Sequence, residues 1–169
     1  MKRLLFPVAL FLLLATQINF AQDSTNYYAH LQPEHREALK IWLADKTGLR
    51  PAVESDASKS DLEVWKRDNQ NFFPYYAAGD FNQDGKEDFA VFLKVEKTAD
   101  DGAVVIFNAP FKNSKPAYFK RGFQVHDFYI EYSKEAKMLY LTKYETHGVY
   151  FKAKGRKYVE YDPHNDEPQ

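Results

Sequence analysis

The sequence predicts an α+β fold in which one N-terminal helix packs on a mainly antiparallel, meander-like β-sheet of about six to eight strands. Three observations carry this prediction. One amphipathic helical pattern lies near the N-terminus, and short apolar runs separated by turn residues follow it along the chain. The chain also holds 14 Phe and 12 Tyr, residue types that favour strands. Short strands in close succession build antiparallel meanders rather than alternating parallel units.

The two ends of the chain differ from the 22–162 segment between them. Lys2 and Arg3, an apolar run over residues 4–14 and Ala21 have the layout of a secretory signal peptide. The run is about half the length that spans a bilayer, so a membrane anchor is the weaker reading. We therefore expect a signal peptide over residues 1–21, a single α+β domain over 22–162 and a flexible tail over 163–169. The mature protein would be secreted or periplasmic, with no membrane span.

Composition excludes several kinds of site. The chain has no cysteine, which removes disulfides, thiolate metal ligands, a cysteine nucleophile and a lipid-modified cysteine. Removing Lys2 and Arg3 from the 23 basic residues leaves 21 against 24 acidic ones, a net charge of −3. With no basic excess, we expect no nucleic-acid partner.

The helix is expected to begin at Pro33, because proline is preorganised for a first helical position. Glu34 complements the helix dipole there, and Gly48 supplies a stop. One apolar stripe contains Ala38, Leu39, Trp42 and Leu43, with Ile41 at its margin. We expect this stripe to cover one face of the sheet.

The remaining elements follow a polar connecting segment over residues 51–60. Residues 62–65 fit a helix or a strand equally well, and Pro74 predicts an edge, a bend or a late start for a strand over 72–78. The continuous apolar run over 89–95 is typical of a strand covered on both faces. Further strands are expected over 103–107, 116–120, 123–132, 138–144, 147–153 and 157–161, with a tight link at residues 121–122.

The most specific motif precedes the 89–95 run. Asp80, Asn82 and Asp84 alternate with outward residues, Gly85 permits a sharp turn, and Asp88 adds a further carboxylate. This spacing of hard oxygen donors suits calcium, with the carbonyl of Lys86 turned inward. It begins like an EF-hand loop, but the twelfth position is Val91, where an EF-hand requires a bidentate glutamate.

The stretch over residues 79–91 instead resembles the calcium loop of FG-GAP and VCBS repeats, which occur in integrin-type β-propellers and many exported bacterial proteins. That loop reads Gly-Asp-x-Asn-x-Asp-Gly-x-x-Asp and joins two adjacent antiparallel strands. The resemblance implies calcium as the cofactor and implies the ligands Asp80, Asn82, Asp84, Lys86 (through its carbonyl) and Asp88. It covers a single loop, and one copy in a chain of this length excludes a complete propeller.

Calcium at this loop is expected to be structural rather than catalytic. A shell completed by protein leaves little room for substrate, and the ion would remove the repulsion between three carboxylates while tying two strands together. The alternative is an acidic β-turn that holds no ion.

Two other groups of residues suggest sites. His126 and Asp127 lie on one predicted segment and Glu145 and His147 near the next, so a hairpin could bring them together as an acid–base or zinc site. Solvent-facing sheet and turn residues are the simpler interpretation. Tyrosines 129, 132, 140, 144, 150, 158 and 161 could form an aromatic sheet face for a glycan or a peptide, although tyrosine is also an ordinary strand residue.

The sequence therefore predicts an exported, calcium-stabilised, non-enzymatic module, a binding or structural protein of the cell envelope or extracellular space. Two alternatives stay open. One is a small hydrolase or other enzyme that uses the His/Asp/Glu cluster. The other is an inhibitor or adhesin-like protein that uses the tyrosine-rich face. We expect a monomer whose partner would be a protein or a glycan.

Overall fold

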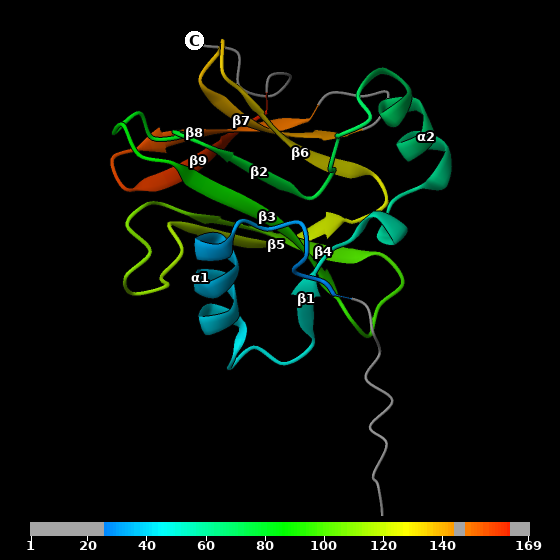
Figure 1. Cartoon of the computed structure of the whole chain (residues 1–169), viewed down its shortest axis with the longest axis horizontal. Helices are drawn as coiled ribbons and strands as arrows, with labels where there is room; N and C mark the ends of the chain where they lie inside the picture. Colours follow the sequence, from blue (N-terminus) through cyan, green and yellow to red (C-terminus); the bar gives the residue numbers. More distant parts are fainter. Residues whose placement is uncertain (1–25, 144–147, 163–169) are drawn as a thin grey trace, which may run out of the picture.

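The computed structural model describes residues 26–143 and 148–162, in which nine strands form two antiparallel sheets (Figure 1). The first sheet has the order β1-β3-β4-β5, and β2 pairs with the other end of β3. The second has the order β6-β7-β8-β9. The strands are β1 (Leu49–Pro51), β2 (Tyr76–Gly79), β3 (Asp88–Val95), β4 (Asp101–Phe107), β5 (Tyr118–Gln124), β6 (Phe128–Ser133), β7 (Met138–Lys143), β8 (Val149–Lys154) and β9 (Lys157–Tyr161).

Strand β3 lies at the centre of the layers. Its side chains alternate between two cores: Phe89, Val91 and Leu93 pack toward helix α1 (Pro33–Leu43), while Ala90 and Phe92 pack toward the second sheet. The prediction that residues 89–95 form a strand covered on both faces is confirmed. Figure 1 shows the same order, with α1 on one side of β3 and the second sheet on the other.

The predicted α+β class with one meander sheet is wrong. The protein is mostly β, and its described part contains two short α-helices besides the two sheets. A single open sheet would leave the apolar faces of its later strands in water. Here Ile130, Leu141 and Phe151 of the second sheet are 2% exposed or less because that sheet folds back onto the first.

The structure also corrects one local prediction and decides another that was left open. Gly122 was expected in a tight link between strands, but it lies inside β5, where Gly102 pairs with Phe123 and Ala103 pairs with Arg121. Gly122 is therefore the extra residue of a bulge, and its φ of 99° suits glycine. The break between strands falls at residues 125–127 instead. Residues 62–65, for which helix and strand were equally expected, lie in helix α2 (Lys59–Asp68).

Some predictions fall outside the described residues. These are the signal peptide over 1–21, the tail over 163–169, Tyr144, Glu145 and His147. Within the described part, no helix is long and apolar enough to cross a membrane.

Candidate metal loop and neighbouring sites

The acidic stretch forms the connection of a hairpin. Gly79 at the end of β2 pairs with Asp88 at the start of β3, so residues 80–87 join two adjacent antiparallel strands. The ring of Tyr132 from β6 lies against Gly79, where a Cβ atom would come within 2.3 Å of it. The Tyr132 hydroxyl also donates to the carbonyl oxygen of Asp80 at 3.1 Å. Gly79 therefore permits close packing of the second sheet on the base of the loop.

Backbone amides within the loop are satisfied by its own side chains. Asp80 accepts the N–H of Asp84 at Oδ1 and the N–H of Gly85 at Oδ2, both at 2.9 Å. Asn82 Oδ1 also accepts the Asp84 N–H at 2.9 Å, and Asp84 Oδ1 accepts the Lys86 N–H at 3.0 Å. Gly85 adopts a φ of 84°, which allows the turn predicted there.

Asp88 is fully buried and joins three parts of the molecule. Its Oδ1 accepts the N–H of Ala109, after β4, at 2.9 Å. Its Oδ2 accepts the N–H groups of Phe81 and Asn82 at 3.2 and 3.3 Å and the hydroxyl of Tyr158 from β9 at 3.4 Å. The carboxylate thus connects the loop, the β4–β5 connection and the second sheet.

The charges of the loop carboxylates affect the pKa values of two groups at this junction, Asp88 and Tyr158. Burial raises the pKa of Asp88 to about 6, and the nearby charge of Asp84 contributes to the rise. Burial is the largest cause that raises the pKa of the Tyr158 hydroxyl, and the charges of Asp88, Asp84 and Asp80 raise it further. Among the described residues, no Lys, Arg or His forms an ion pair with Asp88. The junction is therefore acidic and has no cationic side chain on its buried carboxylate.

The donor set fits calcium in its chemistry. It consists of carboxylate and amide oxygens within nine residues, and a carboxylate that accepts one or two N–H groups retains further lone pairs. In the structure, these oxygens face loop amides. The described residues contain no group of three or more His, Asp or Glu side chains already positioned to share one ion. An ion would have to be bound in addition to the amide contacts or in place of some of them.

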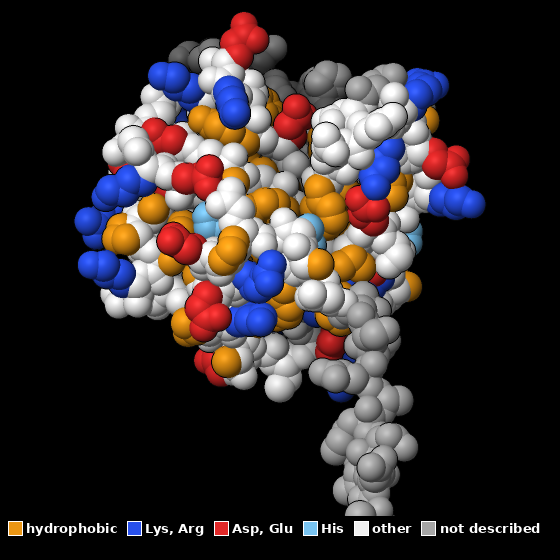
Figure 2. Space-filling model, in the orientation of Figure 1, with side chains coloured by type: hydrophobic (Ala, Val, Ile, Leu, Met, Phe, Trp, Pro, Cys, Tyr) orange, Lys and Arg blue, Asp and Glu red, His pale blue; other side chains and the backbone are white. Residues whose placement is uncertain are grey.

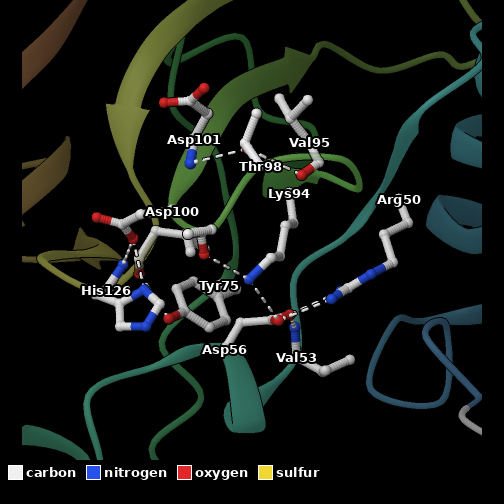
Figure 3. A network of polar contacts seen from close by, with 12 residues as sticks. Arg50, Val53, Asp56, Tyr75, Lys94, Val95, Thr98, Asp100, Asp101 and His126 are labelled. Carbon is white, nitrogen blue, oxygen red and sulfur yellow. Dashed lines mark hydrogen bonds and ion pairs between the residues drawn. The ribbon is translucent and has the colours of Figure 1, made fainter.

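The two described members of the predicted His/Asp/Glu cluster, His126 and Asp127, contact different partners. The ring Nδ1 and the backbone N–H of His126 both contact Asp100 Oδ1, at 2.5 and 2.9 Å (Figure 3). Asp127 instead pairs with Lys143 at 2.8 Å. The pocket beside His126 and Asp127 is lined mainly by apolar residues and has a volume of about 20 Å³, room for about one water molecule. Glu145 and His147 lie outside the described residues.

Sequence reasoning missed a buried ion cluster that includes Asp56, which is 6% exposed. Asp56 accepts two hydrogen bonds from the Arg50 guanidinium, both at 2.7 Å, and lies 3.3 Å from Lys94 Nζ (Figure 3). Burial alone would raise its pKa, but the hydrogen bonds from Arg50 and from the Val53 N–H hold the pKa of Asp56 below its usual range. The cluster fixes β1 and the 3₁₀ turn Glu54–Asp56 to β3. No sequence motif indicated this ion cluster.

A second unpredicted feature is a groove of about 580 Å³ between α1 and residues 109–114. His35 at its base is 2% exposed and stacks on Phe89. Its Nδ1 is 2.7 Å from the Tyr76 hydroxyl, and its Nε2 is 3.8 Å from Glu87. Burial lowers the pKa of His35, so the ring serves as a neutral core group.

The six described tyrosines of the predicted aromatic face do not share one face, and Tyr144 lies outside the described residues. Tyr132 and Tyr158 point inward to the loop junction, and Tyr129 is covered by Trp65 and Phe72. Tyr140, Tyr150 and Tyr161 form a row across β7, β8 and β9. On the face drawn in Figure 2, acidic and basic side chains are interspersed, so no field of one sign covers it.

Comparison of the chain with protein-family models, with curated proteins and with solved structures finds no match.

Proposed function

We propose that the protein is an exported, calcium-stabilised, non-enzymatic module that acts as a binding or structural protein of the cell envelope or extracellular space. The observation that carries the proposal is the acidic hairpin loop. It carries Asp80, Asp84 and Asp88 within nine residues beside the junction of the two sheets, where the described residues place no cation on the buried carboxylate. Its spacing of oxygen donors is that of a calcium loop.

Calcium would supply positive charge at this junction. Asp80, Asn82, Asp84, Asp88 and the Lys86 carbonyl would hold it. The loop joins β2 to β3, and Asp88 also contacts the β4–β5 connection and β9, so stabilising the loop stabilises both sheets. Binding to the folded state alone adds about 2.7 kcal/mol when free calcium is a hundredfold above the dissociation constant.

Thermal unfolding with and without calcium tests the proposal. We expect the melting temperature in calcium to exceed that in EDTA by several degrees at matched ionic strength. The double variant Asp80→Asn/Asp84→Asn should lose this difference, because it removes two of the three charges that an ion would neutralise. Asp101→Asn, which changes an exposed carboxylate outside the loop, should keep it. Equal melting temperatures of the wild-type protein in calcium and in EDTA would overturn the proposal.

A further inference from the structure

The second sheet has an outer face that the described part of the chain covers only at β6. We use this name for the side of β6–β9 that carries Tyr140, Tyr150, Lys152, Val159 and Tyr161, opposite the shared core. Helix α2 reaches one end of it, where Trp65 packs on Tyr129 with ring centroids 4.3 Å apart. Farther along, Val159 is 40% exposed.

Strand register places three tyrosines of this face in one row. Tyr140 pairs with Tyr150 and Tyr150 pairs with Tyr161, with ring centroids 6.3 and 5.3 Å apart. The Tyr150 and Tyr161 rings are stacked with an interplanar angle of 9°. The hydroxyls of Tyr150 and Tyr161 make no hydrogen bond to a described residue, so they are available to a ligand, whereas the Tyr140 hydroxyl donates to Met138 Sδ at 3.7 Å.

Lysines flank the row on the same face. Lys152 and Lys154 follow Tyr150 at alternate positions of β8, and Lys157 lies directly opposite Lys154 on β9. Like charges at directly paired positions are unfavourable, and no described acidic side chain forms an ion pair with any of the three. Glu131 is the single acidic residue at the outward positions of β6–β9. The part of the outer face that carries Lys152, Lys154 and Lys157 is therefore complementary to an anion.

The ring geometry separates two kinds of anionic polymer. Nucleic-acid bases bind by stacking on open aromatic faces. Here the Tyr150 and Tyr161 faces are stacked on each other, and Lys152 Nζ lies 5.8 Å from the Tyr161 ring centroid. Around this stacked pair, the rings offer their edges and hydroxyl groups to a ligand, beside the ammonium groups of the three lysines. That array matches a chain of sugar rings whose carboxylates and hydroxyl oxygens accept hydrogen bonds.

We propose that the outer face of the second sheet binds an acidic polysaccharide of the polyuronate type, through the tyrosine row and Lys152, Lys154 and Lys157. The inference rests on the non-catalytic binding role proposed above. It does not depend on the calcium loop, which lies at the opposite, inward side of this sheet.

Binding of polygalacturonate in EDTA buffer tests the inference, because EDTA prevents calcium from bridging protein and polymer. We expect saturable binding that weakens with salt, and no binding of uncharged dextran. The triple variant Lys152→Gln/Lys154→Gln/Lys157→Gln should bind at least about tenfold more weakly. The triple variant Tyr140→Phe/Tyr150→Phe/Tyr161→Phe, which keeps the rings and removes the hydroxyls, should bind severalfold more weakly.

A matched triple, Lys40→Gln/Lys59→Gln/Lys97→Gln, removes the same charge elsewhere on the surface and should leave the affinity within about twofold. Circular dichroism and melting temperature establish that each variant is folded. The inference is overturned if the wild-type protein does not bind polygalacturonate, or if the matched triple weakens binding as much as the outer-face triple. It is also overturned if an oligo-dT strand binds as tightly as polygalacturonate, because that result indicates a nucleic-acid or general polyanion surface. Loss of the calcium-dependent melting shift has no bearing on these results, so the two proposals fail separately.

Discussion

Asp88 shows how one side chain can serve both a loop and the whole fold. A buried carboxylate without a cationic partner is costly unless hydrogen bonds satisfy it, and Asp88 receives three backbone N–H groups and one tyrosine hydroxyl. Its position at the start of β3 gives it access to the loop, to Ala109 and to the second sheet. The motif predicted a carboxylate here for an ion, and the structure adds a protein role that no local pattern indicates.

The Asp88→Asn variant is therefore expected to be destabilised even without calcium. The amide keeps the shape of the side chain but replaces one acceptor oxygen with an NH₂ group facing N–H donors. We expect the free energy of unfolding in EDTA to fall by about 2–3 kcal/mol, measured by urea denaturation. Asp101→Asn should change it by less than about 0.5 kcal/mol. Equal stability of Asp88→Asn and Asp101→Asn would show that the contacts of Asp88 do not hold the sheets together.

His30 is expected to make stability depend on pH. Its ring stacks on Phe73 at 3.9 Å, and its Nε2 is buried with no hydrogen-bond partner among the described residues. Burial, with the charge of Arg36, lowers the pKa of His30 from 6.5 to about 4, against an opposing effect of Glu54. The unfolded chain thus binds this proton more readily, so the contribution of His30 is fully present above about pH 6.5 and is lost as pH falls toward 4.

Replacing His30 by phenylalanine tests this pH dependence, because the stacked ring stays and the titration is removed. The decrease in unfolding free energy between pH 7 and pH 5 should be smaller in His30→Phe than in the wild-type protein. Urea denaturation at both pH values measures it. Parallel decreases in the two proteins would assign the pH dependence to other groups.

Sequence spacing can predict contacts between residues whose partners lie nearby in the chain. Asp80, Asn82 and Asp84 contact one another's backbone within a few positions, so spacing alone predicts a shared loop. Asp100 and His126 are 26 positions apart and meet only because the strands bring them together. No local spacing can predict such a pair.

At the scale of elements, helix α1 could be predicted from its apolar stripe. The structure buries Leu39 completely and leaves Ile41, placed at the margin of the stripe, 57% exposed. Strand β1 could not be predicted in the same way. It has three residues, ends in Pro51 and pairs only with the C-terminal end of β3. Its formation depends on tertiary contacts, including the Arg50–Asp56 ion pair.

A pair of alanine substitutions in α1 tests the packing of this helix. Leu39→Ala opens a cavity against the first sheet and should lower the free energy of unfolding by about 2–5 kcal/mol. Ile41→Ala removes an exposed side chain from the neighbouring surface and should change it by less than about 0.5 kcal/mol. Chemical denaturation of both variants provides the measurement. Similar losses in both would contradict the observed orientation of α1.

At the scale of the whole molecule, the prediction of one sheet of about six to eight strands differs from the nine strands in two sheets, because it lacked β1 and did not divide the strands. Alternation of apolar residues indicates which face of a strand is buried, but it does not say whether the covering layer is a helix or another sheet. The division depends on the chain crossing at residues 125–127, after which β6 packs on β2 rather than extending β5. A backbone hydrogen bond from Ile130 to Pro74, at 2.7 Å, fixes that crossing.

The shared core predicts that the two sheets unfold together. The side chains of Phe92, Ile106, Ile130 and Leu141 belong to one continuous core between the sheets, and Asp88 links β3 to Tyr158. Exposing either sheet alone would expose the apolar face of the other, at a cost similar to unfolding both.

The two tryptophans report on the two layers separately. Trp42 packs on Phe107 and Phe119 of the first sheet, whereas Trp65 packs on Tyr129 of the second. In the variants Trp42→Phe and Trp65→Phe, the remaining tryptophan gives the fluorescence transition of one layer. We expect each fluorescence midpoint in urea to coincide with the far-ultraviolet circular dichroism midpoint of the same variant. If the Trp65 signal of Trp42→Phe changes at lower urea than the dichroism, the second sheet unfolds independently and the shared core does not couple the layers.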